Sequence, residues 1–347
     1  MEDSLIKRQL KVAVIDSGID INNINLEENI IDGIAFEYDT QKGKVNKSDN
    51  YQDENGHGTS CASIIKREVP DVGMFIIKIL DKNNMTNSKA LIAALKYLLE
   101  MDIRLINLSV ATTRELYQEE LKKVCDELYG QGKILVCSLE NKSDSSYPAV
   151  FDHVIGVRGR DFNGNGDYWY NRNYRIQCVA DSIPVLVPKI NNLFGLFGKN
   201  SKATPLMTGK IARILFDKPN IDFKELQLLL EQTAVKNFWT EEDIYKYCIE
   251  PDEMQQDKYY CFKEEIKELA DIIAETLNLT SANMPLLYQN INLRHREIGL
   301  KLSDCFDLIK NIEKGLNIKL NYNQINLNTF RTLYTLLDFV LEAKSIV

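Results

Sequence analysis

Short apolar runs alternate with longer amphipathic stretches through the first two-thirds of this 347-residue chain, and this alternation constrains the fold most. Residues 87–101 follow an Asn-Ser start and carry apolar side chains at i, i+3 and i+4 spacing, which predicts a capped amphipathic helix. Strands separated by such helices form parallel sheets covered on both faces. We therefore expect an α/β fold with a doubly wound, mostly parallel sheet. The strand candidates are residues 11–16, 74–80, 104–110, 133–139 and 153–159.

The pattern changes near residue 238, which predicts a boundary there. Residues 239–284 are acidic and aromatic and lack alternating strands, so we expect a connecting segment that is helical towards its end. Residues 285–347 have an all-helical pattern, with helices expected over 304–318 and, behind an Asn-Thr cap, over 328–343. The expected organisation is an α/β domain over 1–238, a connector, and a small all-α domain.

Composition excludes several classes of protein. The chain is 44% hydrophobic and 27% charged, as globular proteins are, and no apolar run reaches the roughly 20 residues of a membrane span. The amino terminus leaves no room for a signal peptide or a propeptide, and the seven scattered cysteines fit neither a disulfide framework nor a zinc site. A net charge of −8 gives no basic face for nucleic acid. We expect a cytoplasmic protein without a membrane or nucleic-acid partner.

Three segments carry residues that suit nucleophilic catalysis. Asp16 ends a predicted buried strand, although an Asp there also caps turns. His57 lies between two glycines at the start of an apolar helix, whereas the other two histidines, His153 and His295, lack such a setting. Ser201 precedes a helical stretch with Pro205 in its expected first turn, so Ser201 is either a helix N-cap or a nucleophile at the positive end of a helix dipole.

The sequences DSGID, GHGTS and SKATP around these residues resemble the three signatures of the subtilisin-like serine peptidases of the S8 family, in the order Asp, His, Ser. The resemblance covers roughly residues 8 to 235. It implies a subtilisin-like sheet and a catalytic triad. In that triad Ser201 attacks the scissile carbonyl, His57 accepts and returns the proton, and Asp16 orients His57.

The resemblance also implies an oxyanion hole and a substrate-binding wall. Asn141 follows a predicted strand and precedes a Tyr-Pro-Ala stretch that is also similar to the family, so its side-chain amide and the backbone N–H of Ser201 would receive the oxyanion. In the family the substrate adds a strand beside the segment equivalent to residues 107–113. Ser109, Val110 and Ala111 would then line one wall of the cleft.

The sequence departs from the family at positions beside these groups. Lys199 and Glu140 stand where the family has glycine, and Lys202 stands where it has methionine. We expect Glu140 and Lys199, with Lys202, to shape the groove and to narrow the choice of substrate. The triad residues are all present, which favours an active peptidase over a decayed one.

The carboxyl-terminal residues resemble an acyl carrier protein more weakly. EIGLKLSDCFDLIKNIEKGLNIKL is similar to the carrier's turn, second helix and following loop, but the alignment places Leu302 at the position of the modified serine and Ser303 one residue later. Residues 285–347 hold eight Lys or Arg and six Asp or Glu, whereas carriers are acidic. A generic helical bundle and a carrier-related docking module without phosphopantetheine on Ser303 are both open, and we favour the second.

The combined expectation is a cytoplasmic serine endopeptidase that removes the leader from a ribosomally made precursor peptide, since carrier-related modules accompany peptidases in natural-product maturation. The helical module would recruit the precursor or a maturation enzyme. The alternatives are a general intracellular protease and a catalytically weak scaffold that binds a precursor without cutting it. We expect no cofactor, and no acidic loop predicts a metal site.

Overall fold

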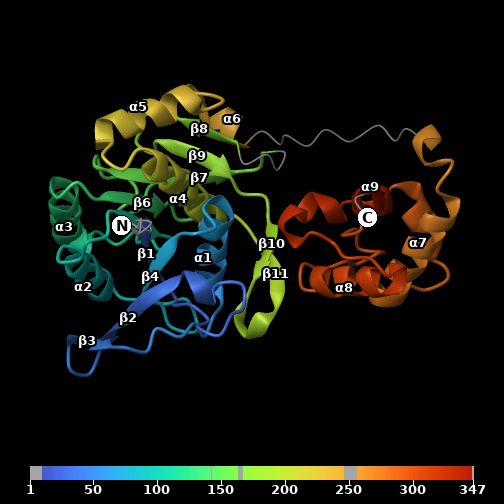
Figure 1. Cartoon of the computed structure of the whole chain (residues 1–347), viewed down its shortest axis with the longest axis horizontal. Coiled ribbons are helices and arrows are strands. Elements are labelled where there is room, and N and C mark those ends of the chain that lie inside the picture. Colours follow the sequence, from blue (N-terminus) through green and yellow to red (C-terminus); the bar gives the residue numbers. More distant parts are fainter. Residues whose placement is uncertain (1–9, 142, 163–166, 246–255, 346–347) are drawn as a thin grey trace, which may run out of the picture. The chain divides into compact units, whose positions relative to one another are not determined.

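The computed structural model describes residues 10–141, 143–162, 167–245 and 256–345 (Figure 1). These residues form two compact units. Unit 1 comprises residues 1–183, 188–193 and 198–246, and unit 2 comprises residues 184–187, 194–197 and 247–347. Unit 2 therefore begins earlier than the expected helical domain, and it includes two short segments taken from the middle of the peptidase-like region.

Unit 1 is built around a nine-stranded sheet with the order β3-β2-β4-β1-β5-β6-β7-β9-β8. The seven strands from β2 to β9 in that order are parallel, and the edge strands β3 and β8 pair antiparallel with their neighbours. The doubly wound, mostly parallel sheet is thus confirmed. The strands are β1 (Lys11–Asp16), β2 (Ile30–Asp39), β3 (Lys44–Ser48), β4 (Gly73–Lys78), β5 (Leu105–Leu108), β6 (Ile134–Ser138), β7 (Val154–Arg160), β8 (Tyr168–Tyr170) and β9 (Cys178–Asp181).

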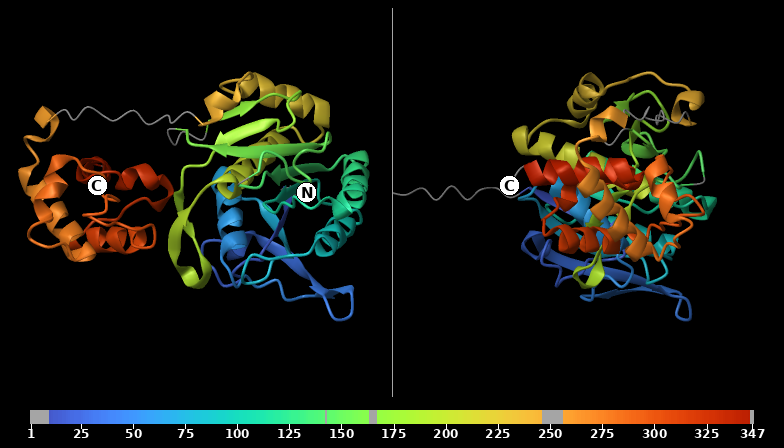
Figure 2. Two further views of the ribbon diagram at one scale, coloured as in Figure 1. Left: turned by 180° about the vertical axis from the view of Figure 1, so that it is seen from behind. Right: turned by 90° about the vertical axis from the view of Figure 1, so that its right-hand side faces the viewer.

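Helices cover both faces of this sheet, as Figures 1 and 2 show. Helices α1, α4 and α5 cover one face, where they pack with Val12 and Val14 of β1. Helices α2 and α3 cover the other face, where they pack with Ala13 and Ile15, the residues of β1 that alternate with these. Strands buried on both faces need apolar residues at every position, which explains their continuous apolar runs. The helices are α1 (His57–Glu68), α2 (Ser88–Leu98), α3 (Gln118–Gly130), α4 (Asn200–Asp217), α5 (Phe223–Thr233) and α6 (Glu241–Tyr245).

All five predicted strands are present within one or two residues of their expected bounds. The predicted helix cap is also confirmed, because the Asn87 side chain accepts a hydrogen bond from the Lys89 backbone N–H at the start of α2. The strands that the pattern did not reveal are β2, β3, β8 and β9. They lie at or near the sheet edges, where exposed positions admit charged and polar residues.

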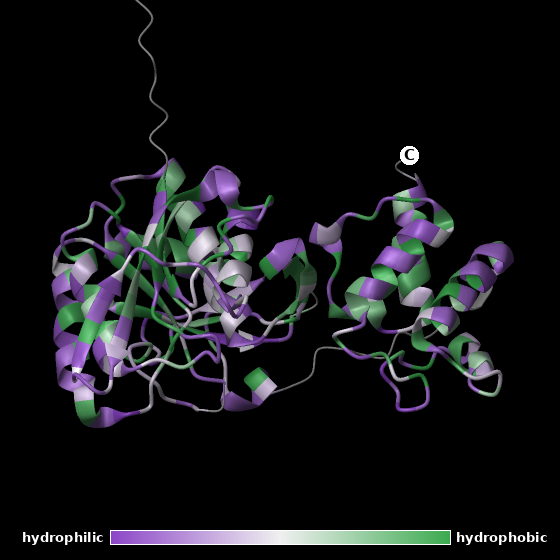
Figure 3. Cartoon of the chain, turned by 90° about the horizontal axis from the view of Figure 1, so that it is seen from below, coloured by the Kyte–Doolittle hydropathy of each residue, from purple (hydrophilic) through white to green (hydrophobic). Residues whose placement is uncertain are grey.

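Unit 2 is a helical bundle built around a β-hairpin. Its core joins α7 (Lys263–Leu277), α8 (Cys305–Leu316) and α9 (Leu333–Ser345) with residues of β10 (Val185–Pro188) and β11 (Phe194–Phe197). The backbone N–H of Leu186 donates to the carbonyl of Ile325, and the Phe194 ring packs against Phe306 and Tyr322. The helices carry hydrophobic and hydrophilic residues in alternation (Figure 3), so their apolar faces fill this core.

Two expectations about unit 2 differ from the structure. The helix α7 lies in the segment expected to be a connector, yet its buried residues Leu269 and Ile273 belong to the helical core. The Asn-Thr pair at 328–329 lies within a 3₁₀ turn (Leu327–Phe330), and α9 begins only at Leu333. The part of the connector at residues 246–255 lies outside the described residues. Within the described ranges, no helix has the length and apolar character that crossing a bilayer requires.

Candidate active site

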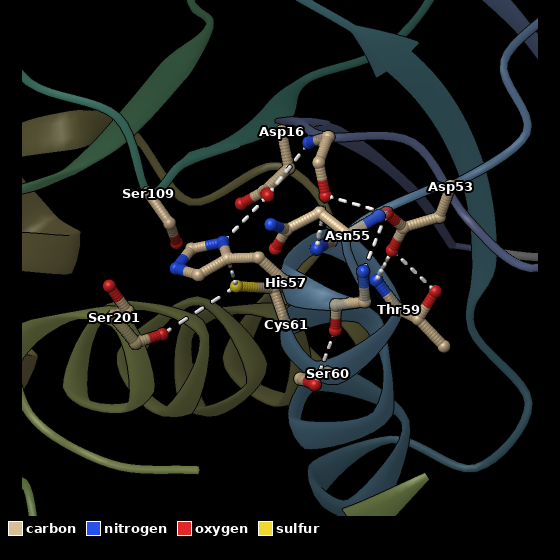
Figure 4. A network of polar contacts seen from close by, with 12 residues as sticks. Asp16, Asp53, Asn55, His57, Thr59, Ser60, Cys61, Ser109 and Ser201 are labelled. Atoms are coloured by element: carbon tan, nitrogen blue, oxygen red, sulfur yellow. Dashed lines mark hydrogen bonds and ion pairs between the residues drawn. The ribbon is translucent and has the colours of Figure 1, made fainter. Parts of the chain in front are cut away.

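The sequence-predicted site residues gather at the carboxyl edge of the sheet of unit 1. Asp16 is the last residue of β1, Ser109 directly follows β5, and Asn141 comes three residues after β6. These three strands are neighbours in the sheet and run parallel, so their carboxyl ends meet. Ser201 reaches the same place from the amino-terminal turn of α4, and His57 from that of α1 (Figure 4).

Asp16 and His57 are directly bonded. The Nδ1 atom of His57 lies 2.7 Å from Oδ1 of Asp16, which is fully buried and also accepts the Ser17 backbone N–H at 2.7 Å. Burial lowers the pKa of His57, but the Asp16 carboxylate and Cys61 together outweigh it and raise that pKa well above 6.5. A charged imidazole is therefore stabilised here, and the ring is oriented by its bond to the carboxylate.

Two glycines explain how His57 comes so close to Asp16. A Cβ on Gly58 would lie 2.1 Å from the Gly18 carbonyl and 3.1 Å from Cβ of Asp16, so only glycine fits between α1 and the turn after β1. Gly56 has φ of +90°, a left-handed conformation that glycine adopts without strain. The glycines on both sides of His57 are thus required by backbone geometry.

Ser201 is the second residue of α4, and the helix cap position belongs to Lys199, which makes no side-chain cap bond. The N-cap interpretation of Ser201 is therefore wrong. Figure 4 shows Ser201 on the side of the His57 ring that faces away from Asp16, towards the second ring nitrogen. Pro205 lies inside the helix and not in its first turn, which corrects the expected position of that residue.

The turn that holds Ser201 is tied to the sheet by Asn200, a residue that the sequence pattern did not single out. Its side-chain oxygen accepts the Gly159 backbone N–H at 2.7 Å, and its amide donates to the Leu139 carbonyl at 2.7 Å. The Asn200 backbone N–H lies 3.2 Å from Oδ1 of Asn141. Asn141 is therefore next to the nucleophile turn, with the oxygen of its amide engaged and the NH₂ end on the other side.

The predicted substrate-binding wall follows β5 at the same edge. Ser109 and Val110 are each 8% exposed, and Ala111 is partly exposed. Beyond them, Thr112 pairs with Tyr147 through two backbone hydrogen bonds of 2.8 and 3.0 Å. This pairing closes the segment onto the loop after Asn141, because only five residues separate Asn141 from Tyr147.

The three charged departures from the family pattern have different environments. Glu140 and Lys199 are exposed next to Asn141 and Asn200, and their place beside the groove stays a prediction. Lys202 is only 4% exposed and forms a buried ion pair with Asp181, so the expectation that it shapes the groove is wrong. Its ammonium group bonds Asp181, the last residue of β9, because a buried charge needs a partner of opposite sign.

Two further buried groups at the site were missed by sequence reasoning. Cys61, one turn after His57 in α1, lies 3.8 Å from its Nδ1 and 3.6 Å from the Ser201 carbonyl oxygen. Asp53 accepts hydrogen bonds around the start of α1. The i to i+4 spacing from His57 to Cys61 was a usable signal, whereas nothing in the sequence marked Asp53 among many surface acids.

One group of His, Cys, Asp and Glu in the described part of the chain has the proximity of metal ligands, namely Asp16, His57 and Cys61, with ligand atoms within 4.8 Å of one another. Their atoms are already joined to each other by the hydrogen bonds above, so we assign no metal. In unit 2, Ser303 is exposed, two residues before α8, and its hydroxyl donates to Oδ1 of Asp304 at 2.7 Å.

A buried Asp bonded to a His, with a Ser at a helix amino terminus facing the second ring nitrogen, defines a serine hydrolase site on an α/β sheet. A model of the subtilase family (peptidase S8) matches residues 7–258. The chain belongs to this family and is a subtilisin-like serine protease, a hydrolase that cleaves peptide bonds within chains.

Individual relatives agree with this assignment. The major intracellular serine protease of Bacillus subtilis (strain 168) is 28% identical over 224 residues, covering 60% of this chain and 68% of its own. Subtilisin DY of Bacillus licheniformis is 24% identical over 240 residues, covering 65% and 83%. The structure named Sphericase superposes with a TM-score of 0.54 and 20% identity, covering 65% of this chain and 83% of that one, which shows the common fold.

Proposed function

We propose that Ser201, His57 and Asp16 form the catalytic triad of this protease. The observation that carries the proposal is the 2.7 Å bond between His57 and Asp16, with Ser201 on the opposite side of the same ring (Figure 4). The carboxylate selects the tautomer with hydrogen on Nδ1, in which the lone pair that accepts a proton is on Nε2. The raised pKa of His57 suits a base that must hold that proton until the leaving group takes it.

The reaction then follows from these positions. The Ser201 hydroxyl oxygen bonds to the carbonyl carbon of the scissile peptide while its proton passes to His57 Nε2. The protonated His57 gives that proton to the departing amine nitrogen, and the C–N bond breaks to leave an acyl-enzyme. Water, deprotonated by His57, hydrolyses the ester and restores the serine.

Asn141 and the backbone N–H of Ser201 are proposed to bind the oxyanion of the tetrahedral intermediate. The bond of 3.2 Å that Oδ1 of Asn141 accepts from the Asn200 N–H supports this, since it holds the Asn141 side chain beside the turn that carries Ser201. The Ser201 N–H belongs to the first turn of α4, where helix N–H groups lack intrahelical partners and the dipole favours negative charge.

The substrate is proposed to be a ribosomally made precursor peptide, bound as an added strand along Ser109, Val110 and Ala111, with cleavage releasing its leader. Two observations support a selective enzyme. Exposed charges of opposite sign, Glu140 and Lys199, flank the nucleophile turn. The Thr112–Tyr147 pairing ties the residues after Ala111 to the segment that follows Asn141.

The cytoplasm is the proposed location, because two of the relatives are named as intracellular proteases and the described cysteines are free thiols. Unit 2 is proposed to dock the precursor or a maturation enzyme, as a carrier-related module without phosphopantetheine. The hydroxyl of Ser303 is already bonded to Asp304 and precedes α8 by two residues, which supports a module without the prosthetic group. Intact-mass measurement of the purified protein tests this, and an added mass of phosphopantetheine would contradict it.

The triad assignment is tested with a fluorophosphonate probe and with denatured casein. The probe should label wild-type protein at Ser201, and Ser201→Ala should abolish both labelling and cleavage. Labelling or cleavage that survives in Ser201→Ala would overturn the triad. A scaffold without activity would leave Ser201 unlabelled in the wild type.

Selectivity is tested separately with a peptide library made from a tryptic digest of a bacterial lysate. A leader peptidase should cut few of these peptides, within a narrow sequence pattern, and should cut denatured casein at only a few sites. Extensive cleavage of casein at many unrelated sites would instead identify a general intracellular protease.

A further inference from the structure

The helix that carries His57 begins without a capping side chain. Its N-cap residue is Gly56, at φ of +90°, and His57 is the first helical residue. The N–H groups of the first turn have no partners within a helix, and in most helices a Ser, Thr, Asp or Asn at the cap supplies one. The position of His57 therefore depends on groups that come from elsewhere in the chain.

Two side chains from other segments take over this role. The Ser17 hydroxyl oxygen accepts the Gly58 N–H at 2.9 Å, and Oδ2 of Asp53 accepts the Thr59 N–H at 3.0 Å. Oδ1 of Asp53 accepts the Gly56 N–H at 2.8 Å. All three donors lie within two residues of His57.

Asp53 also joins these segments to each other. Its carboxylate, 2% exposed, accepts the hydroxyl of Ser17 at 2.9 Å, the hydroxyl of Thr59 at 2.7 Å and the Asn55 N–H at 2.9 Å (Figure 4). Ser17 in turn donates its backbone N–H to Oδ1 of Asp16, the same oxygen that His57 approaches. The chain of bonds from Asp53 through Ser17 thus connects both ends of the Asp16–His57 pair.

We propose that Asp53 is a positioning residue for the general base: its buried carboxylate replaces the missing cap of α1 and, through Ser17, holds the His57 turn against Asp16. The inference rests on the proposed triad, since it explains how that triad is held. Asp53 does not touch the reacting atoms, and its effect reaches them through His57.

A carboxylate at this place has an electrostatic effect as well. The amino terminus of a helix is positive and disfavours an imidazolium, so α1 on its own lowers the pKa of His57. The negative charge of Asp53 lies at the amino terminus of α1 and offsets the positive field of the helix there. The groups that act on the pKa of His57 include Asp16 from β1 and Cys61 from α1. Burial lowers the pKa of Lys189 against the opposing effect of Cys61, Asp53 and Asp16, so this cation faces the same cluster.

The test follows the titration of His57 directly, by NMR of the imidazole groups in the full-length protein. The chain has three histidines, so His57→Gln identifies the signal of His57. Asp53→Asn should lower the pKa of His57 by about 0.5 to 1 pH unit. It should also reduce the kcat for a casein-derived peptide, or the rate of fluorophosphonate labelling, by about 10- to 100-fold with KM changed less than about threefold.

Asp222→Asn is the matched control. Asp222 caps α5 in the same unit, with its carboxylate on the Glu225 N–H at 2.8 Å, and it acts on Arg104 just before β5 begins, whereas the triad residues lie at the carboxyl edge of the sheet. Loss of that capping charge should lower stability without moving the pKa of His57 or kcat. If Asp53→Asn fails to fold, the isosteric Thr59→Val removes one hydroxyl bond to Asp53, and Thr59→Ser, which retains it, should restore wild-type kcat.

Each outcome is decisive. The positioning role is overturned if Asp53→Asn has the same His57 pKa and the same kcat as the wild type. It is also overturned if that pKa is unchanged and Thr59→Val and Thr59→Ser have equal kcat. A wild-type protein that neither cleaves casein nor reacts with the probe would overturn the proposed catalytic function. The NMR titration would still decide whether Asp53 controls His57 in that case.

Discussion

The thiol of Cys61 donates a hydrogen bond to the backbone carbonyl of Ser201, with 3.6 Å between Sγ and the oxygen. In an uninterrupted helix this carbonyl would accept the N–H four residues later, but residue 205 is proline and has none. The same sulfur lies 3.8 Å from Nδ1 of His57. One buried thiol from α1 therefore satisfies the carbonyl that Pro205 leaves open, directly beneath the triad.

This thiol should be unreactive despite its position. Burial raises the pKa of Cys61 to about 11, so almost none of it is thiolate at neutral pH. Iodoacetamide at pH 7.5 should therefore alkylate the exposed Cys261 well before Cys61 and leave activity unchanged. Peptide mass spectrometry of timed samples, compared with residual activity, checks this. Inactivation that follows modification of Cys61 would show that the thiol is accessible.

The Asp16–His57 bond determines how activity depends on pH. His57 must be neutral to accept a proton, and its pKa lies well above 6.5 because Asp16 and Cys61 together outweigh the lowering effect of burial. We expect kcat/KM to rise with pH along a one-proton limb centred above pH 6.5. Asp16→Asn should move that limb to lower pH and reduce kcat by about 10⁴-fold. A limb at or below pH 6.5 in the wild type would contradict the assigned pairing.

Lys199 lies in a strained conformation. Its φ of +65° and ψ of −161° fall in a region that only glycine adopts freely, and glycine is the residue of the family pattern here. Lys199→Gly should therefore raise the free energy of unfolding by about 1 kcal/mol, measured by urea denaturation. Lys199→Ala removes the charge and keeps the Cβ, so it should give little or no stabilisation. Equal stability of the two variants would show that the strain has no cost.

How far the sequence predicted this structure depends on the kind of contact. The buried strands and the three motif residues were predictable, because continuous apolar runs and adjacent glycines are local signals. Asp53 and Asn200 were not, since their roles depend on partners brought together only by the fold. The i to i+4 spacing marks Cys61 as a neighbour of His57, but not as the donor to the Ser201 carbonyl. Lys202 was misjudged for the same reason: the sequence shows a charge next to the nucleophile but not the Asp181 that buries it.

The hairpin of β10 and β11 should be essential to unit 2. Leu186 is fully buried in the helical core, and its N–H is bonded to the Ile325 carbonyl. Leu186→Ala should lower the free energy of unfolding of this unit by about 2–4 kcal/mol, as other large-to-small core changes do. Leu302→Ala, at a leucine 44% exposed in the same unit, is the control and should cost well under 1 kcal/mol. Similar values for both would show that the hairpin does not belong to the core.

Removing one member of the buried ion pair of Lys202 and Asp181 should destabilise the protein more than removing the charges of both. Asp181 accepts the backbone N–H groups of Phe162 and Ile183 on Oδ1, and its other oxygen takes the Lys202 ammonium. Lys202→Met leaves a buried carboxylate without its cation and should cost about 3–5 kcal/mol in urea denaturation. Adding Asp181→Asn removes the charge but keeps an oxygen for both N–H groups, so the double variant should recover most of that loss.

If Lys202→Met alone costs less than about 1 kcal/mol, the carboxylate is solvated or protonated and the pair contributes little. If the double variant is no more stable than Lys202→Met, the loss comes from packing of the lysine stem and not from the uncompensated charge.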